Sequence, residues 1–291
     1  MTALLGPQDL VLCAPPVLHV PLFDRLAPAR AAGFTGVSLL PGDVDGLKPR
    51  GWDTSDIARR IADEGLAIAE VDCIGWWLPS HLALPSADSM VALVRALTPE
   101  RVVPMAAAIG ARSISVVEVC GTSFSLDEGA EAFARICDLA RDHGLLVHLE
   151  FVPFGGIPDL AAAWRLVEAA GRANGGLTID SWHLFRSGST LEQLGHIPGE
   201  RIFSVQINDA PVTPQPDLLE ETITRRLLPG EGSFDLTGLI QTLDRIGSTA
   251  PIGVEVFSTA LAGMPMEALA ETWAGAARLV IDRARGNSEH G

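Results

Sequence analysis

Residues 145–153 read LLVHLEFVP, an apolar and β-rich run that carries a carboxylate near its end. The two-residue period of a strand places His148 and Glu150 on one face and Leu149 and Phe151 on the other. A carboxylate among Leu and Val side chains in a buried strand costs several kcal/mol unless it is paired or bound to a metal. The run therefore predicts a buried strand that carries Glu150 as a functional residue.

Three later runs repeat this pattern, with a polar side chain where a core residue would be expected. They are GGLTIDSWH (175–183), IFSVQINDAP (202–211) and PIGVEVFS (251–258). Their polar residues are Asp180, Gln206 and Glu255, and with Glu150 they should meet at the rim where the strands of an α/β barrel end. Three carboxylates and an amide oxygen form a hard oxygen set, which favours one divalent cation. We expect Mn²⁺ or Mg²⁺, with Co²⁺ or Zn²⁺ as alternatives.

Strand-like and helix-like patterns alternate along the whole chain, and Gly, Pro, Asp or Ser bounds each of them. The predicted strands are Leu10–Ala14, Gly36–Leu40, Ala67–Ile74, Ser113–Cys120, Leu145–Val152, Leu177–Asp180, Ile202–Asn208 and Ile252–Val256. The predicted helices are Phe23–Ala32, Ser55–Glu64, Ser89–Ile109, Leu126–His143, Asp159–Ala173, Leu191–Leu194, Leu236–Arg245 and Met266–Arg285.

Eight alternations in 291 residues predict an α/β fold, a single (β/α)8 TIM barrel over residues 1–291. An open doubly wound sheet usually has fewer strands, and it often carries a GxGxxG motif after the first one. Here the first strand is followed by APPVLHVPLF (14–23), which lacks that motif.

Composition excludes several function classes. A formal net charge of −15 argues against a nucleic-acid partner, because phosphate binding depends on clustered Lys and Arg. Lys48 is the only lysine and lies in a polar, loop-like stretch, so Schiff-base chemistry is not expected. The four cysteines are scattered without a CxxC motif, which argues against a disulfide framework or a thiolate zinc site.

The sequence also predicts the cellular location of the protein. No apolar run approaches the roughly 18 to 20 residues of a membrane span, and the start, MTALLGPQDL, lacks the basic and apolar regions of a signal peptide. We therefore expect a cytoplasmic enzyme with a small-molecule substrate and no membrane or nucleic-acid partner.

At these residues the chain resembles the sugar phosphate isomerase/epimerase superfamily, which comprises xylose-isomerase-like TIM barrels with an AP endonuclease 2-type domain. The segments that carry the resemblance are HLEF (148–151), DSWH (180–183), VQINDAP (205–211), LLPGEGSFDL (227–236) and GVEVF (253–257). The superfamily includes ketose 3-epimerases, inosose dehydratases and isomerases, hydroxypyruvate isomerases and 3-dehydroshikimate dehydratases. The resemblance implies that Glu150, Asp180, Gln206 and Glu255 hold one metal ion, and that His183 approaches the metal or the substrate.

The resemblance also implies the chemistry, which is removal of a proton next to a carbonyl. Glu150 and Glu255 are then the catalytic acid and base, with His183 beside them. Most epimerases have a histidine as third ligand, whereas this chain has Gln206, as in some 3-dehydroshikimate dehydratases. We expect a metal-dependent isomerase or epimerase of a polyhydroxylated carbonyl compound, with a lyase of the dehydroshikimate or inosose type as the alternative.

Further residues are candidates for substrate binding. Arg225 or Arg226, in the loop before LLPGEG, could bind a carboxylate or phosphate bidentately, or both could be solvated. Glu118 and Asp72 could contact substrate hydroxyls or form ion pairs. Trp182 could line an apolar pocket.

Three aromatic residues share that last prediction: Trp76, Trp77 and Phe185. If they do line the pocket, the substrate has an apolar or ring portion. His148 either orients Glu150 or is a core histidine with satisfied hydrogen bonds.

Other functions were weighed against this one. An endonuclease of the abasic-site class would need a histidine-rich zinc cluster and a basic groove, which the sequence lacks. A non-catalytic binding barrel is not excluded by fold. Cleavage of a C-glycoside's 3-keto sugar, which usually requires a small partner subunit, also stays open, as does a homodimer.

Overall fold

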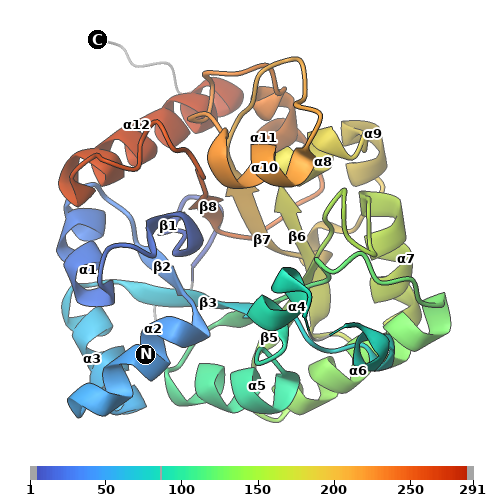
Figure 1. Cartoon of the computed structure of the whole chain (residues 1–291). Helices are drawn as coiled ribbons and strands as arrows, with labels where there is room; N and C mark the ends of the chain where they lie inside the picture. Colours follow the sequence, from blue (N-terminus) through green and yellow to red (C-terminus); the bar gives the residue numbers. More distant parts are fainter. Residues whose placement is uncertain (1–4, 86, 287–291) are drawn as a thin grey trace.

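The protein forms a closed barrel of eight parallel strands in chain order, in which β1 also pairs with β8 (Figure 1). The computed structural model describes residues 5–85 and 87–286; residues 1–4, 86 and 287–291 of the expected domain lie outside the described part. The strands are β1 (Leu10–Leu12), β2 (Gly36–Leu39), β3 (Ala67–Ile74), β4 (Ser113–Val117), β5 (Leu146–Glu150), β6 (Gly175–Asp180), β7 (Ile202–Ile207) and β8 (Ile252–Val254). The predicted TIM barrel is confirmed.

Helices form a ring around the barrel and cover its outer face (Figure 1). The α-helices are α1 (Leu22–Ala31), α2 (Pro41–Leu47), α3 (Thr54–Asp63), α4 (Ser89–Val94), α5 (Pro99–Ala108), α6 (Leu126–Arg141), α7 (Leu160–Ala170), α8 (Ser181–Arg186), α9 (Leu191–Leu194), α10 (Leu218–Thr224), α11 (Leu236–Arg245) and α12 (Met266–Arg285). Short 3-10 helices are η1 (Pro15–Val17), η2 (Lys48–Arg50), η3 (Pro79–Ala83) and η4 (Gly199–Arg201).

Local signals explain where the main helices begin and end. Ser125 caps α6 by accepting from the backbone N–H of Glu128, and Asp159 caps α7 in the same way. Gly171 ends α7 with φ +63°, a left-handed conformation that glycine adopts without steric cost.

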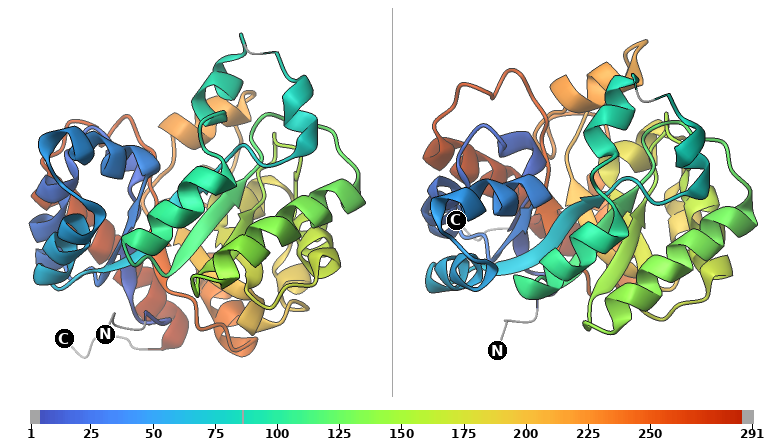
Figure 2. Two further views of the ribbon diagram at one scale, coloured as in Figure 1. Left: turned by 90° about the horizontal axis from the view of Figure 1, so that it is seen from below. Right: turned by 60° about the horizontal axis from the view of Figure 1, so that its bottom comes forward.

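The predicted helix Ser89–Ile109 was wrong in one respect, because the structure divides it into α4 and α5. Thr98 precedes Pro99 and is extended (φ −90°, ψ 156°), since a residue before proline disfavours the helical region. The break frees α4 from the outer ring, and in both views of Figure 2 its segment projects beyond the ends of the strands. The sequence reading also missed α2, α8 and α10, which are six or seven residues long.

A buried polar network fills part of the barrel interior. His148 Nε2 lies 3.2 Å from Glu70 Oε2, and Ser204 Oγ donates to the same oxygen at 2.9 Å. The other ring nitrogen of His148 lies 2.6 Å from Thr178 Oγ1. His148 is thus a core histidine with satisfied hydrogen bonds, and its recorded partners do not include Glu150.

Among residues 5–85 and 87–286, every helix is too short or too polar to cross a membrane.

Candidate metal centre

Four strands place the predicted metal ligands at one rim of the barrel. Glu150 and Asp180 are the last residues of β5 and β6, Gln206 lies in β7, and Glu255 directly follows β8. Asp180 and Gln206 are partners in the pairing of β6 with β7. All four side chains are buried.

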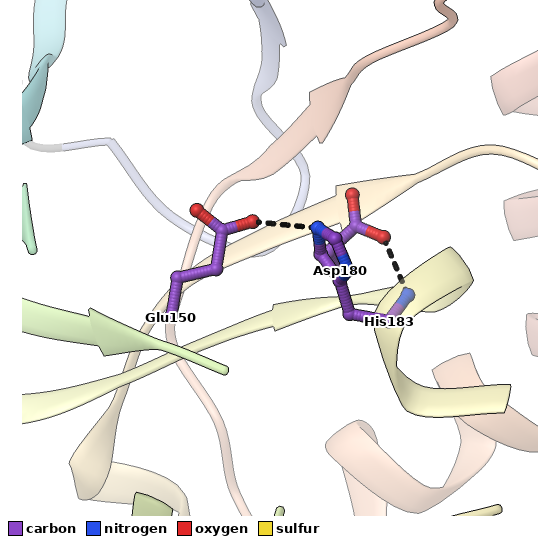
Figure 3. Close-up of side chains that lie close together, drawn as sticks. All are labelled: Glu150, Asp180 and His183. Atoms are coloured by element: carbon purple, nitrogen blue, oxygen red, sulfur yellow. Dashed lines mark hydrogen bonds and ion pairs between the residues drawn. The ribbon is translucent and has the colours of Figure 1, made fainter. Parts of the chain in front are cut away.

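Glu150, Asp180 and His183 form a compact group in which the potential ligand atoms lie within 4.8 Å of one another (Figure 3). Asp180 caps α8, because its Oδ1 accepts a hydrogen bond from the backbone N–H of His183 at 3.0 Å. This cap fixes the first turn of α8 and brings His183 Nε2 to 3.4 Å from Glu150 Oε1. This geometry is consistent with the expectation that His183 approaches the metal position.

Arg226 supplies a buried positive charge between two of the carboxylates. Its Nη1 donates to Asp180 Oδ2 at 2.8 Å and to Glu255 Oε2 at 3.0 Å. Thr222 holds the other side of the guanidinium, through its carbonyl oxygen at 3.0 Å from Nε and its hydroxyl at 2.7 Å from Nη2. Trp182 packs beneath it, with the guanidinium carbon 5.7 Å from the ring centroid.

The electrostatics of the site show an excess of negative charge. Burial raises the pKa of Glu150 well above its usual range, and the charges of Glu255, Asp72 and Asp180 raise it further. Burial likewise raises the pKa of Glu255 far above normal, against the opposing effect of Arg226. One arginine therefore does not compensate these carboxylates, and a divalent cation would relieve the remaining repulsion.

Asp180 and His183 respond differently to the same surroundings. Burial acts to raise the pKa of Asp180, but the positive charge of Arg226 outweighs it and lowers the pKa, together with hydrogen bonds from Arg226 and from the backbone N–H of His183. Burial lowers the pKa of His183 to about 4, with Arg226 contributing in the same direction. His183 is therefore a neutral imidazole at neutral pH.

The residues present fit a divalent cation. Within the described part of the chain, Gln206 Oε1 is buried and accepts no hydrogen bond, and His183 Nδ1 also lacks a partner. An unpaired buried amide oxygen is costly unless something binds it. Carboxylate and amide oxygens suit Mn²⁺ and Mg²⁺.

A cavity of about 360 Å³ opens above this group, and Asp72, Glu150, His183, Arg226 and Glu255 line it. Asp180 and Gln206 are not part of its lining. Of the two roles left open for Asp72, its place in the cavity lining suits contact with substrate hydroxyls. Burial raises the Asp72 pKa to about 7, and the charge of Glu70 adds to this effect.

The structure does not bring the other substrate-binding candidates to this cavity. Arg225 is exposed and lies 3.5 Å from Glu220, because it directly follows α10 on the solvent side while Arg226 turns inward. Glu118 accepts hydrogen bonds from the backbone N–H groups of Cys120 and Gly156, so it ties two loops together.

Trp182 is fully buried and donates from Nε1 to Glu221 Oε1 at 3.0 Å, so it supports Arg226 from behind. The other aromatic candidates also lie elsewhere. Trp76 and Trp77 line a separate cavity of about 430 Å³ beside α5 and α6, and Phe185 stacks on Phe234.

Sequence reasoning missed two groups of residues at this site. Thr222 holds Arg226 through hydrogen bonds, and the sequence of the short helix α10 gives no indication of this role. Apolar residues of α4 and α10 line the cavity, including Met90, Leu93, Leu219 and Ile223. The sequence offers no signal for them, because their apolar side chains look like core residues; the structure shows Leu93 and Ile223 exposed beside the cavity, as in a binding surface.

Comparison with known proteins agrees with the barrel fold. The model of the xylose isomerase-like TIM barrel family matches residues 26–280. The chain is 33% identical over 140 residues to a 3-dehydroshikimate dehydratase of Pseudomonas aeruginosa, a match that covers 48% of this chain and 22% of the relative. It is 35% identical over 130 residues to an inosose isomerase of Bacillus velezensis, covering 44% of this chain and 45% of the relative.

Both matches thus span less than half of the relative's length. Among solved structures, the crystal structure of the IolI protein with a bound zinc atom has a TM-score of 0.82 at 20% identity. That likeness covers 95% of this chain and 99% of the other, and it shows a shared fold.

Proposed function

The chain belongs to the family of xylose isomerase-like TIM barrels, and from this premise we propose that it is a divalent-metal-dependent isomerase or epimerase of a polyhydroxylated carbonyl compound. One observation carries the proposal. Glu150 and Glu255 both line the same cavity, both have raised pKa values, and they lie at the ends of β5 and β8, which are separated by β6 and β7. Two such carboxyls can exchange a proton with a substrate held between them.

Glu150, Asp180, Gln206 and Glu255 are the residues that would hold the metal, with His183 beside them. This oxygen set favours Mn²⁺ or Mg²⁺, while the zinc of the IolI structure makes Zn²⁺ a further candidate. When bound, a divalent cation polarises a substrate carbonyl and stabilises negative charge next to it.

The side chains around the cavity carry out the proton transfers and stabilise the negative charge that develops. A carboxylate of the Glu150 and Glu255 pair removes the proton next to the carbonyl, and the other carboxyl returns a proton to the neighbouring carbon or to the opposite face. His183, neutral because burial lowers its pKa to about 4, donates a hydrogen bond to a substrate oxygen. Arg226 is positively charged, lines the cavity and attracts the oxygen on which negative charge develops.

A dehydratase is the second candidate, and Gln206 favours it. The family resemblance implies a histidine at this position in most epimerases and a glutamine in some 3-dehydroshikimate dehydratases. The 33% identity to a 3-dehydroshikimate dehydratase supports the same reading. In that reaction the first proton transfer is unchanged, and a β-hydroxyl group then leaves as water.

The test is a substrate panel assayed on the purified, Mn²⁺-loaded protein. Keto-sugars, inososes and 3-dehydroshikimate are incubated in D₂O, and exchange of the proton next to the carbonyl is followed by NMR. Ultraviolet absorbance distinguishes dehydration, because loss of water gives a conjugated product. Bound metal is quantified by elemental analysis, and chelation should abolish exchange until Mn²⁺ is restored.

Glu150→Gln and Glu255→Gln should each lower the exchange rate by about 10²- to 10⁴-fold. Glu220→Gln is the matched control, since Glu220 is exposed and pairs with Arg225 outside the cavity. A protein that binds no metal, or Glu150→Gln and Glu255→Gln variants that exchange at the wild-type rate, would contradict the proposal.

A further inference from the structure

The cavity above the candidate metal centre is divided into a polar floor and an apolar wall. Its floor is formed by the charged and polar residues already described. The apolar side of the cavity, here called the apolar wall, comprises Leu18, Met90, Leu93, Leu219, Ile223 and Phe257. A simple sugar carries hydroxyl groups on several sides, and each one that binding removes from water needs a hydrogen-bonding partner.

Four separate loops build the apolar wall, and one of them contributes Phe257 directly after β8. Leu18 follows η1 after β1, Met90 and Leu93 belong to α4 between β3 and α5, and Leu219 and Ile223 belong to α10 between β7 and α11. In both views of Figure 2 the segments of α4 and α10 lie near each other beyond the strand ends. Convergence of several loops on one mouth is typical of a binding site at this rim of a TIM barrel.

The wall exposes large apolar side chains to solvent. Leu93 is 69% exposed, and Leu18 and Ile223 are each 51% exposed. They are three of the eight large apolar side chains that are exposed in the described part of the chain. Their grouping around one cavity mouth indicates a surface that is covered when a ligand binds.

Hydrogen-bonding capacity is confined to the floor. Among the described residues that line the cavity, the polar side chains are those of Asp72, Cys73, Glu150, His183, Thr222, Arg226 and Glu255. A ligand with hydroxyl groups on every side would leave the outer ones unpaired against the wall, which disfavours binding. A ligand with one polar end and one apolar end matches both parts.

The geometry points to a substrate in which the polyhydroxylated carbonyl portion carries an aromatic substituent. The polar portion occupies the floor, and the aromatic ring lies against the apolar wall. This inference rests on the proposed function, because that function supplies the carbonyl portion and its orientation toward Glu150 and Glu255. A ring is the substituent that best fits a wall of Leu, Ile, Met and Phe side chains, since it buries a large apolar area at little entropic cost.

The test compares 3-keto-glucose with its phenyl glycoside on the Mn²⁺-loaded protein. Affinities are measured by isothermal titration calorimetry, and α-proton exchange is measured by NMR. We expect the phenyl glycoside to bind about 10- to 100-fold more tightly, because burial of one ring contributes an affinity factor of that order. Equal affinities would overturn the inference, while exchange with 3-keto-glucose would leave the proposed function intact.

Substitutions in the apolar wall test whether the phenyl group binds there. Leu93→Asn and Ile223→Asn should remove most of the gain from the phenyl group and leave the affinity for 3-keto-glucose unchanged. Leu279→Asn is the matched control, because Leu279 is 66% exposed on α12 and does not line the cavity. Loss of the gain in Leu279→Asn as well, or its persistence in both wall variants, would contradict the assignment of the ring to the wall.

Two further outcomes separate the alternatives. If phenyl glucoside without a carbonyl binds with the full gain and no keto compound exchanges its proton, the proposed function fails while the apolar subsite stands. If sedimentation shows a dimer that Leu93→Asn dissociates, and the phenyl group adds no affinity, the wall is a contact between two copies of the chain and the inference is overturned.

Discussion

Replacement of Arg226 by methionine isolates the charge balance of the candidate metal centre. Arg226 is 2% exposed and holds Asp180 and Glu255 together through one nitrogen, at 2.8 and 3.0 Å. Methionine keeps the apolar stem but leaves two buried carboxylates without their positive partner. Breaking a buried pair by removal of one member costs about 3–5 kcal/mol.

This cost should appear as a lower melting temperature of the metal-free protein. For a chain of this size, 1 kcal/mol corresponds to about 2 °C, so Arg226→Met should melt about 6–10 °C below wild type. Arg225→Met is the control one residue away, because its pair with Glu220 is solvent-exposed and contributes at most about 0.5 kcal/mol. Differential scanning calorimetry in the presence of a chelator measures both.

Added Mn²⁺ should narrow the gap between Arg226→Met and wild type. The cation compensates the charge that the arginine no longer supplies, and the carboxylates become available to it. The variant should therefore bind Mn²⁺ more tightly than wild type, and each tenfold decrease in Kd narrows the gap by about 1.4 kcal/mol when the site is saturated. The reasoning is refuted if Arg226→Met loses no more stability than Arg225→Met, or if Mn²⁺ widens the gap.

Three further changes test other parts of the structure. Gln206→Leu should weaken Mn²⁺ binding by at least about tenfold in a titration. It should change the free energy of unfolding of the metal-free protein by less than about 1 kcal/mol, because the amide oxygen accepts no hydrogen bond. An unchanged Mn²⁺ affinity would exclude Gln206 as a ligand. Asp72 has a folded pKa of about 7, above its unfolded value of about 4, so wild type loses stability as pH rises from about 4 to about 7. Urea unfolding should show Asp72→Asn gaining stability over wild type across this window and levelling off above it; a constant difference would contradict this. His148→Leu should lower the free energy of unfolding by about 3 kcal/mol, since it removes the partner of buried Glu70, and a loss below 1 kcal/mol would argue against the buried network.

The barrel and the positions of the strand-end residues were predictable from sequence. Apolar runs of four to eight residues mark buried strands, and a carboxylate inside such a run marks a site because its burial is costly. Glu150, Asp180 and Glu255 followed from this rule alone. Strand ends were predicted less well, because the barrel strands stop pairing before the apolar runs do.

The ion pairs inside the site were not predictable from the sequence. Arg226 and Asp180 are 46 residues apart, and only the folded chain shows that Arg226, rather than Arg225, turns inward. The short helices α4 and α10 carry too few residues for a helical period to be recognised. Their apolar side chains look like core residues in sequence, whereas the structure places them around the mouth of the cavity.

The pairing of β1 with β8 has a consequence for how the protein is made. Leu10 to Leu12 lie beside Ile252 to Val254. The first strand, β1, can therefore pair with β8 only after about 240 further residues have been synthesised. Contacts between such distant segments slow folding. Glu255 joins the site in that same last event, and a nascent chain released before β8 would hold an incomplete ligand set and an open sheet edge, which is a surface for aggregation.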